Sequence, residues 1–276
     1  MIVDFHAHTF PDSLADRAVG ALAASSGMRP RTDGRVSSLS ESARNAGISL
    51  TVNLPVATRP GHWESMARTG KGINEASKLT GVMSFAGVHP REESPERVLD
   101  ALKEMVFLGI KLHPVFQDTP LDDPHTLRLL KAARERDLIV TVHGGIDISF
   151  PDRSESSWER ILRMLDAVPP KKLVLAHMGA WAQWKEAERF LSTPGVWLDT
   201  SFCLSPSRDP AFLPADRFVR MVRLHGADRV LFGTDSPWTD QAEALRLIRE
   251  TALTEEEKRK ILSVNALSLL GISGAE

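Results

Sequence analysis

The most constraining feature of the sequence is a regular alternation of short apolar runs with amphipathic stretches. Eight runs rich in β-branched residues recur along the chain, at 2–5, 49–54, 82–88, 109–112, 138–142, 173–176, 196–198 and 229–232. Apolar strands that alternate with helical patterns are typical of a parallel sheet whose outer face is covered by helices. Eight such units in 276 residues match the (β/α)₈ barrel. We therefore expect an α/β protein with a single barrel domain over residues 1–276.

Helix ends are marked by capping residues. Ser94 and Asp123 each precede a proline, a pattern typical of a first helical turn. Thr254 with Glu257 three residues later fits a capping box, and Gly271 is expected to end the last helix. An open doubly wound sheet is the alternative fold, but it predicts a glycine-rich phosphate loop after the first strand, and the sequence has none there.

Charge and composition restrict the classes of partner that the protein can bind. Lys and Arg number 34 against 36 Asp and Glu, so the net charge of −2 gives no basic surface for nucleic acid. No apolar run approaches the ~20 residues of a membrane helix, and the first residues lack the layout of a signal peptide. A single cysteine, Cys203, rules out an internal disulfide. We expect a cytoplasmic protein with a small-molecule substrate, and a homo-oligomer stays open.

Several polar side chains stand where the predicted strands end. They are His6 and His8 after the first strand, Lys111 and His113 after the fourth, His143 after the fifth, His177 after the sixth and Asp235 after the eighth. The carboxyl ends of barrel strands meet at one mouth, where barrel enzymes carry their chemistry. Residues i and i+2 of a strand point to the same face, so His6 and His8 are expected to point inward together.

These residue types suit a divalent metal. Neutral imidazole and carboxylate hold Zn²⁺ at ~2.0–2.2 Å, and a hydrolytic site leaves one position open to water. A lone His-x-His is often incidental, and a single histidine after a buried strand is a core residue as often as it is a metal ligand. Four histidines and one aspartate at a single mouth form a stronger joint signal. We predict one or two ions per chain, with Zn first and Mn or Fe as alternatives.

Five segments together resemble the amidohydrolase superfamily, and most closely its amidohydrolase-related (amidohydrolase 2) branch of small barrels: 3–8, 111–114, 142–144, 176–179 and 233–237. The resemblance covers essentially the whole chain, to a terminal helix ending in 265–271. It implies a (β/α)₈ enzyme in which His6, His8 and Asp235 bind the more buried metal. It also implies that His143 and His177 bind a second metal, or bind and orient substrate and water.

Lys111 stands in a Lys-Leu-His-Pro segment that is similar to the strand-four motif of dihydroorotases, whose lysine is carboxylated and bridges two metals. An ordinary ammonium beside two cations is repelled, so Lys111 is either carbamylated or turned away. A pair with an acid such as Asp4 is the alternative. His113 shares the face of Lys111 and can be a ligand or a hydrogen-bond donor to substrate.

The chain departs from three related groups. After His8 it lacks the arginine that holds the substrate carboxylate in dihydroorotases. Residues 87–90 resemble TatD-type hydrolases, but Lys111 stands where that group has glutamate. Residues 4–9 are also similar to the polymerase-and-histidinol-phosphatase type of phosphoesterase, whose further ligands come in a different order.

The predicted site supports hydrolysis. A divalent metal lowers the pKa of a bound water to ~7. Asp235 would take the proton from this water and pass it to the leaving group, while His177 or His143 polarises the substrate oxygen. We expect a metal-dependent hydrolase of an amide, lactone or ester, with Asp235 and His177 as catalytic residues. A metal-dependent decarboxylase or hydratase of the same superfamily is the alternative, and a non-catalytic metal-binding barrel is the third hypothesis.

Other side chains fall on the loops after strands and are candidates for the substrate pocket: Arg59, His62, His89, Arg91, Gln117, Arg153, Trp181 and Trp238. Arg29, Arg31 and Arg35 lie on a long early loop and could attract an anionic substrate, although a solvated loop is the plainer interpretation. Cys203 has no base nearby in the pattern and is interpreted as structural. We place His125 and His225 on helix surfaces.

Overall fold

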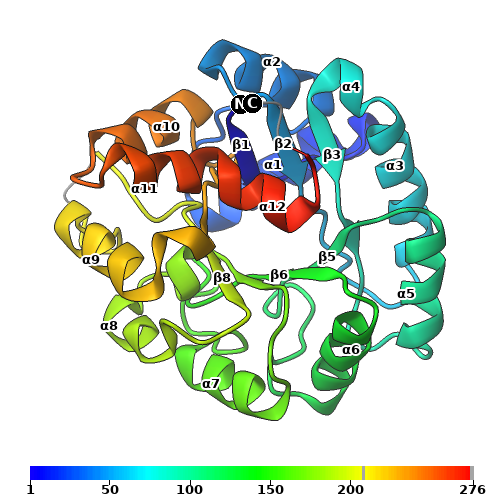
Figure 1. The fold of residues 1–276 in the computed structure, drawn as a ribbon. Coiled ribbons are helices and arrows are strands. Elements are labelled where there is room, and N and C mark those ends of the chain that lie inside the picture. Colours follow the sequence, from blue (N-terminus) through cyan, green and yellow to red (C-terminus); the bar gives the residue numbers. More distant parts are fainter. Residues whose placement is uncertain (207–208, 274–276) are drawn as a thin grey trace.

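The computed structural model describes residues 1–206 and 209–273, which alternate between strands and helices around a ring (Figure 1). A first sheet contains, in order, β1 (Val3–Ala7), β2 (Leu50–Asn53) and β3 (Val82–Ser84). A second sheet contains, in chain order, β4 (Ala86–Gly87), β5 (Gly109–Leu112), β6 (Ile139–Val142), β7 (Leu173–Leu175), β8 (Val196–Asp199) and β9 (Val230–Leu231). Neighbouring strands in both sheets run parallel, as the predicted alternation requires.

Two junctions connect the sheets. Only Phe85 separates β3 from β4, so the predicted strand 82–88 is divided into two. At the other junction, the Phe5 amide donates to the Phe232 carbonyl at 2.7 Å, and Ala7 pairs in parallel with Ser236. The first strand therefore lies beside the segment that follows β9. All eight predicted apolar runs contain strands.

Helices follow the strands and form the outer layer (Figure 1). They are α1 (Asp12–Ser26), α2 (Val36–Ala46), α3 (Trp63–Glu75), α4 (Ser77–Thr80), α5 (Pro95–Glu104), α6 (Pro124–Glu135), α7 (Trp158–Ala167), α8 (Trp184–Ala187), α9 (Ala215–His225), α10 (Gln241–Glu250), α11 (Glu255–Arg259) and α12 (Asn265–Leu270). A π-helical segment, Lys260–Val264, joins α11 to α12. None of the helices in the described ranges is long and apolar enough to cross a membrane.

Capping chemistry sets several helix ends as predicted. The Asp123 side chain accepts a backbone hydrogen bond at the start of α6, and Thr254 with Glu257 forms a capping box at the start of α11. Gly271 ends α12 at φ 68°, a left-handed conformation that carries no steric cost for glycine. Ser94 differs, because it precedes α5 without a side-chain capping bond.

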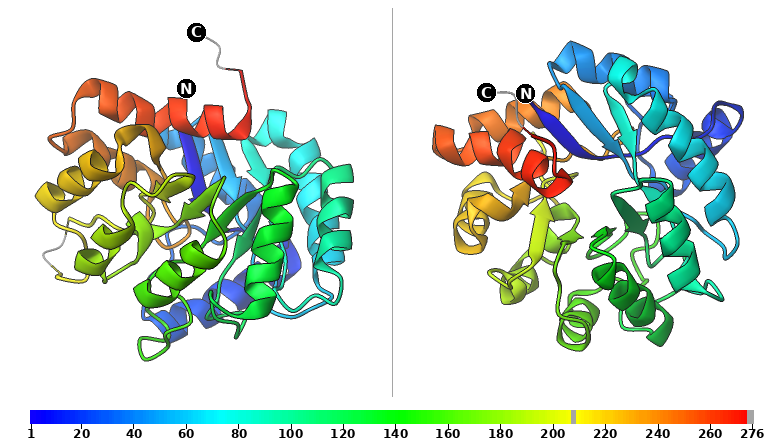
Figure 2. Two further views of the ribbon diagram at one scale, coloured as in Figure 1. Left: turned by 60° about the horizontal axis from the view of Figure 1, so that its bottom comes forward. Right: turned by 45° about the vertical axis from the view of Figure 1, so that its right-hand side comes forward.

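Apolar side chains fill the interior of the ring at its amino end. The cluster contains Val3, Phe5, Val52, Leu54, Phe85, Ile139, Val174 and Leu231. Leu267 and Leu270 of α12 pack into the same cluster. Figure 2 shows α12 and α1 at opposite ends of the molecule. Because α12 covers the amino end, the polar side chains at the carboxyl end face a space bounded by loops and by α1.

Candidate metal centre

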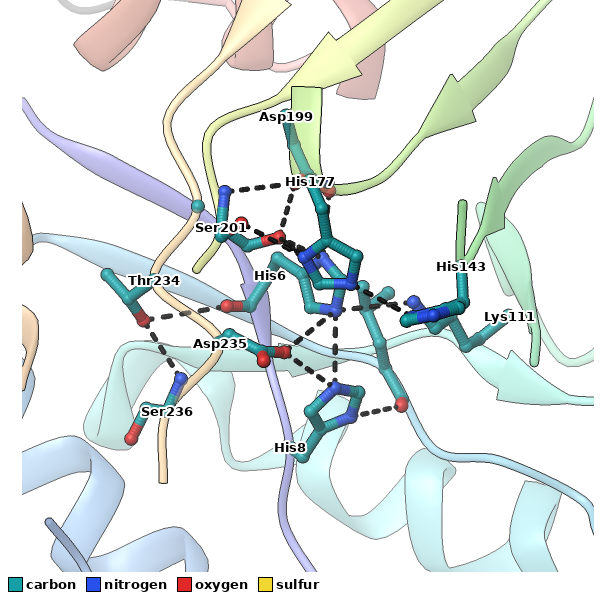
Figure 3. A network of polar contacts seen from close by, with 12 residues as sticks. His6, His8, Lys111, His143, His177, Asp199, Ser201, Thr234, Asp235 and Ser236 are labelled. Carbon is teal, nitrogen blue, oxygen red and sulfur yellow. Dashed lines mark hydrogen bonds and ion pairs between the residues drawn. The ribbon is translucent and has the colours of Figure 1, made fainter. Parts of the chain in front are cut away.

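The six side chains predicted as metal ligands gather at the carboxyl end of the ring (Figure 3). His6 lies in β1, with His8 just beyond it, and Lys111 lies in β5. His143 follows β6 directly, and His177 lies in a short 3-10 turn after β7. The structure therefore brings together residues that are up to 229 positions apart (235 − 6 = 229).

Three atoms form the tightest part of this cluster. His6 Nε2 lies 3.2 Å from His8 Nε2 and 3.3 Å from Asp235 Oδ1, and His8 Nε2 lies 3.1 Å from the same oxygen. Ligand atoms held ~2.0–2.2 Å from one ion lie roughly 3.0–3.5 Å from one another. The spacing of the three atoms therefore fits a shared metal ion.

Hydrogen bonds fix which nitrogens of the two rings carry protons. His6 Nδ1 donates to Asp199 Oδ2 at 2.8 Å, and His8 Nδ1 donates to the Leu54 carbonyl at 2.8 Å. Burial, assisted by the nearby Lys111 amine, lowers the pKa of His6 to about 3, so its ring is neutral. A neutral ring protonated at Nδ1 has a lone pair on Nε2. The His6 lone pair thus faces His8 Nε2 and a carboxylate oxygen, an arrangement that suits a cation.

Asp4 anchors Thr234, the residue that precedes Asp235. The Asp235 residue adopts a left-handed backbone, with φ 65°, and its amide donates to the His6 carbonyl at 2.7 Å. The buried Asp4 carboxylate accepts bonds from the Thr234 amide at 3.0 Å, the Thr234 hydroxyl at 2.7 Å and Gln241 Nε2 at 2.7 Å. Burial raises the pKa of Asp4 to about 6, against these hydrogen bonds. Among the described residues, the hydrogen-bond partners of Asp4 do not include Lys111. The alternative pairing of Asp4 with Lys111 is therefore wrong.

Lys111 points into the cluster rather than away from it. Its side chain is fully buried, and Nζ lies 3.2 Å from His6 Nε2. Burial lowers the pKa of Lys111 to about 8, and the charges of Asp199 and Asp235 oppose this shift. The amine therefore borders the group formed by His6, His8 and Asp235.

His177 lies on the other side of His6. A ligand atom of His177 lies within 4.8 Å of ligand atoms of both His6 and Asp235. Its Nδ1 donates to the Ser201 carbonyl at 2.9 Å, so Nε2 carries the lone pair, and this atom lies 3.0 Å from His143 Nδ1. His177 has φ 57°, outside the usual range for a residue other than glycine.

The local chain around His177 requires close backbone packing. A Cβ atom on Gly144, next to His143, would lie 2.2 Å from the Gly179 carbonyl oxygen. Only glycine fits at that position, and this close approach brings the turn after β6 against the turn after β7. His143 and His177 are adjacent as a result.

Asp199 is an important residue that the sequence interpretation missed. It ends β8, and besides His6 it accepts bonds from the His177 amide and the Ser201 amide, each at 3.0 Å. It also accepts a short bond from the Ser201 hydroxyl. One buried carboxylate thus orients two candidate ligands. The available signal was its position directly after the predicted strand 196–198.

A second group of possible ligands contains His113, His143 and Asp147. His113 Nε2 lies 3.4 Å from Asp147 Oδ2. The rings of His113 and His143, however, stack with centroids 4.2 Å apart and planes inclined by only 16°. An ion bound by an imidazole lies in the plane of that ring, and two stacked rings have no such plane in common. This arrangement favours His113 as a hydrogen-bonding group rather than as a co-ligand of His143.

The pocket candidates divide into two groups. His62, Trp181 and Trp238 line a cavity of about 1090 Å³ above the histidine cluster. The other pocket candidates are not among the described residues that line this cavity; they are Arg29, Arg31, Arg35, Arg59, His89, Arg91, Gln117 and Arg153.

Several of these eight side chains serve the scaffold. Gln117 Nε2 donates to the carbonyls of Ala57 and Val88 at 2.9 and 2.8 Å. Arg153 pairs with Asp118 and Glu155 at 2.6 Å.

Three remaining predictions concern residues away from the cluster. His125 is exposed on α6, as predicted, and Cys203 is buried, where burial raises the pKa of its thiol. The prediction for His225 is wrong, because its side chain is buried and its Nε2 donates to the Val196 carbonyl at 3.1 Å.

A ring of parallel strands with imidazoles and a carboxylate at its carboxyl end is the architecture of metal-dependent barrel enzymes. A family model described as amidohydrolase matches residues 3–272, and the chain belongs to this family. Members of the family are metal-dependent enzymes, as the resemblance in the sequence implied. No curated protein matches the chain by sequence.

Solved structures with the same fold act on small acids, according to their names. A 2,6-dihydroxybenzoate decarboxylase from Rhizobium is similar with a TM-score of 0.71 at 17% identity, over 99% of each chain. A probable 2-pyrone-4,6-dicarboxylic acid hydrolase from Acinetobacter baumannii has a TM-score of 0.70 at 16% identity, over 98% of this chain and 99% of that one.

A further similar structure contains a metal. It is a 5-carboxyvanillate decarboxylase from Novosphingobium aromaticivorans complexed with manganese, with a TM-score of 0.71 at 14% identity, over 98% of this chain and 96% of that one. These similarities confirm the predicted (β/α)₈ fold.

Proposed function

We propose that the protein is a metal-dependent hydrolase that attacks an amide, lactone or ester carbon. The observation that carries this proposal is the convergence of His6 Nε2, His8 Nε2 and Asp235 Oδ1 within 3.3 Å of one another. Such a set of unprotonated acceptors at the floor of a large cavity is suited to a divalent ion that substrate can reach.

In this proposal His6, His8 and Asp235 hold the first ion. His143 and His177 hold a second ion or orient the substrate, and a carbamylated Lys111 would bridge the two ions. The sequence favours Zn, and the manganese in similar structures makes Mn an equal candidate.

His6, His8 and Asp235 would hold a divalent ion, which would supply an activated water at neutral pH. Asp235 would accept the proton of that water and deliver it to the leaving group, because its carboxylate lines the cavity. His177 faces the same space, and with Nε2 also protonated its ring would donate a hydrogen bond to the substrate oxygen. Asp199 holds the proton of His6 on Nδ1, so that His6 would present Nε2 to the ion.

Decarboxylation is the second candidate. It is favoured by the number of decarboxylases among the similar structures and by the buried amine of Lys111, which could face a substrate carboxylate if it is not carbamylated. Two ions with a carbamylated Lys111 favour hydrolysis, whereas one ion with a free amine favours the decarboxylase.

The test combines metal analysis with one substitution. The purified protein is expected to contain at least one Zn, Mn or Fe ion per chain, and to hydrolyse one member of a panel of chromogenic esters, anilides and lactones. Asp235→Asn is expected to abolish turnover and to keep most of the metal. Asp166→Asn, on the exposed face of α7, is the matched control and should remain active. Full activity of Asp235→Asn, or activity in a metal-free protein, contradicts the proposal.

A further inference from the structure

The candidate metal centre lies at the floor of a cavity of about 1090 Å³. This volume slightly exceeds the ~300–1000 Å³ that is typical of small-molecule sites. The cavity therefore has room for a substrate with a substantial body beyond the reacting carbonyl.

Most of the cavity wall is apolar. Representative wall side chains are Phe10, Leu14, Leu22, Met66, Phe116 and Trp238. Leu14 and Leu22 lie on α1, and Met66 lies on α3, so two separate helices contribute apolar surface. Apolar walls bind ligands by removing apolar surface from water.

The charges of the wall do not suit an anionic substrate body. Among the described residues that line the cavity, Lys111 is the single lysine or arginine. It lies at the floor beside His6, together with Asp235. The charged side chains that remain for the wall are the carboxylates of Asp12 and Asp147.

Arg35, which precedes α2, is paired with surface carboxylates and is absent from the described lining. Arg35 bonds to Asp16 at 2.8 Å and to Asp33 at 2.9 Å, on the exposed surface. A carboxylate moved from water into an apolar wall without a cationic partner is strongly disfavoured. A negatively charged substrate body would therefore be rejected by the described part of this wall.

We propose that the site takes substrates whose body beyond the reacting carbonyl is hydrophobic and carries no carboxylate, such as medium-chain or aryl esters and amides. This inference rests on the proposed function of the same site. It separates the protein from the similar structures whose names specify benzoates or a dicarboxylic acid.

The first experiment measures binding without turnover. Octanoate and octanedioate have the same chain length and one carboxylate in common, so they differ only at the end remote from the metal. Isothermal titration calorimetry on the metal-loaded protein is expected to show octanoate bound at least tenfold more tightly. From butanoate to octanoate, affinity should rise about three- to fourfold per methylene.

Equal or tighter binding of octanedioate, or an affinity independent of chain length, overturns the inference. The outcome for the hydrolase proposal is read separately, from the ester panel and the metal analysis. A preference for octanoate in a metal-loaded protein that hydrolyses nothing contradicts the hydrolase and leaves the nature of the wall established.

A matched pair of substitutions tests whether the preference for octanoate arises in the cavity. Leu14 lines the cavity and is 42% exposed, whereas Leu79 on α4 is 87% exposed and absent from the described lining. Leu14→Lys adds a cation to the wall and is expected to reduce the preference for octanoate at least fivefold. Leu79→Lys should leave the preference unchanged. An equal effect of both substitutions contradicts the assignment of the cavity as the binding site.

Discussion

The Asp199 carboxylate lies 2.8 Å from His6 Nδ1, and both side chains are completely buried. The same carboxylate binds the His177 amide at 3.0 Å. A single acidic side chain at the end of β8 therefore fixes the ring of one candidate ligand and the backbone of another. Groups that orient metal ligands in this way contribute to metal affinity although they do not touch the ion.

Asp199→Asn should weaken metal binding by about 10- to 100-fold. The neutral amide lacks the charge that holds the His6 proton on Nδ1, so Nε2 is no longer reliably presented. Competition with a chelator measures this change, and Asp166→Asn serves as the exposed control. An unchanged metal affinity would show that Asp199 has only a structural role.

Removal of the metal should lower the Tm. At a free ion concentration 1,000 times the Kd, a bound ion stabilises the folded state by about 4 kcal/mol. For a chain of this size the loss corresponds to roughly 8–16 °C in Tm. The Tm of His8→Ala should be insensitive to chelation, and the Tm of His125→Ala, on the surface of α6, should respond as the wild type does. An equal response of His8→Ala contradicts the assignment of His8.

Lys111→Met should reduce the metal content from two ions per chain to one if Lys111 is carbamylated. The methionine side chain is unbranched and one heavy atom shorter than that of lysine, and it lacks the nitrogen that would carry the bridging carboxylate. Elemental analysis of the variant and of Lys103→Met, on the exposed side of α5, tests this expectation. One ion in both variants and in the wild type would favour the decarboxylase instead.

His225 should make the fold sensitive to acid. Burial, with a smaller contribution from the Arg229 charge, lowers the pKa of His225 to about 4. Below pH 6.5 the unfolded chain therefore binds a proton that the folded chain excludes, and the free energy of unfolding falls as the pH decreases from 6.5 to 4. The effect of this one group is limited to about 3 kcal/mol.

His225→Gln isolates this contribution from that of the other buried histidines. The glutamine amide can still donate to the Val196 carbonyl, and it does not titrate. Urea unfolding between pH 4 and 7 should show a smaller dependence on pH for the variant than for the wild type. Identical slopes would mean that His225 is not protonated on unfolding.

The fold and the cluster could be predicted because both follow from simple periodicities. Apolar runs locate the strands, and the first polar residues after them locate the carboxyl end of the ring. His6 and His8 are two positions apart at the end of the first strand, so their common direction follows from the pleat.

The features that were predicted wrongly or missed also have physical explanations. His225 is a polar residue at a buried position, and the spacing of Phe218, Met221, Val222 and His225 along α9 is that of a single helical face. Asp199 directly follows the predicted strand 196–198, but its contacts with His6 and His177 arise only when the ring closes, so its role was missed. The stacking of His113 on His143 depends on side-chain packing that periodicity does not describe.

The packing of α12 against the interior of the ring has a consequence for how molecules pass through this protein. Leu267 and Leu270 fill the amino end together with the interior side chains, so the ring is closed on that side. Substrate and product must then use the same opening, under α1. A large hydrophobic product left in this passage would obstruct the next substrate, and product inhibition should strengthen as the acyl chain lengthens.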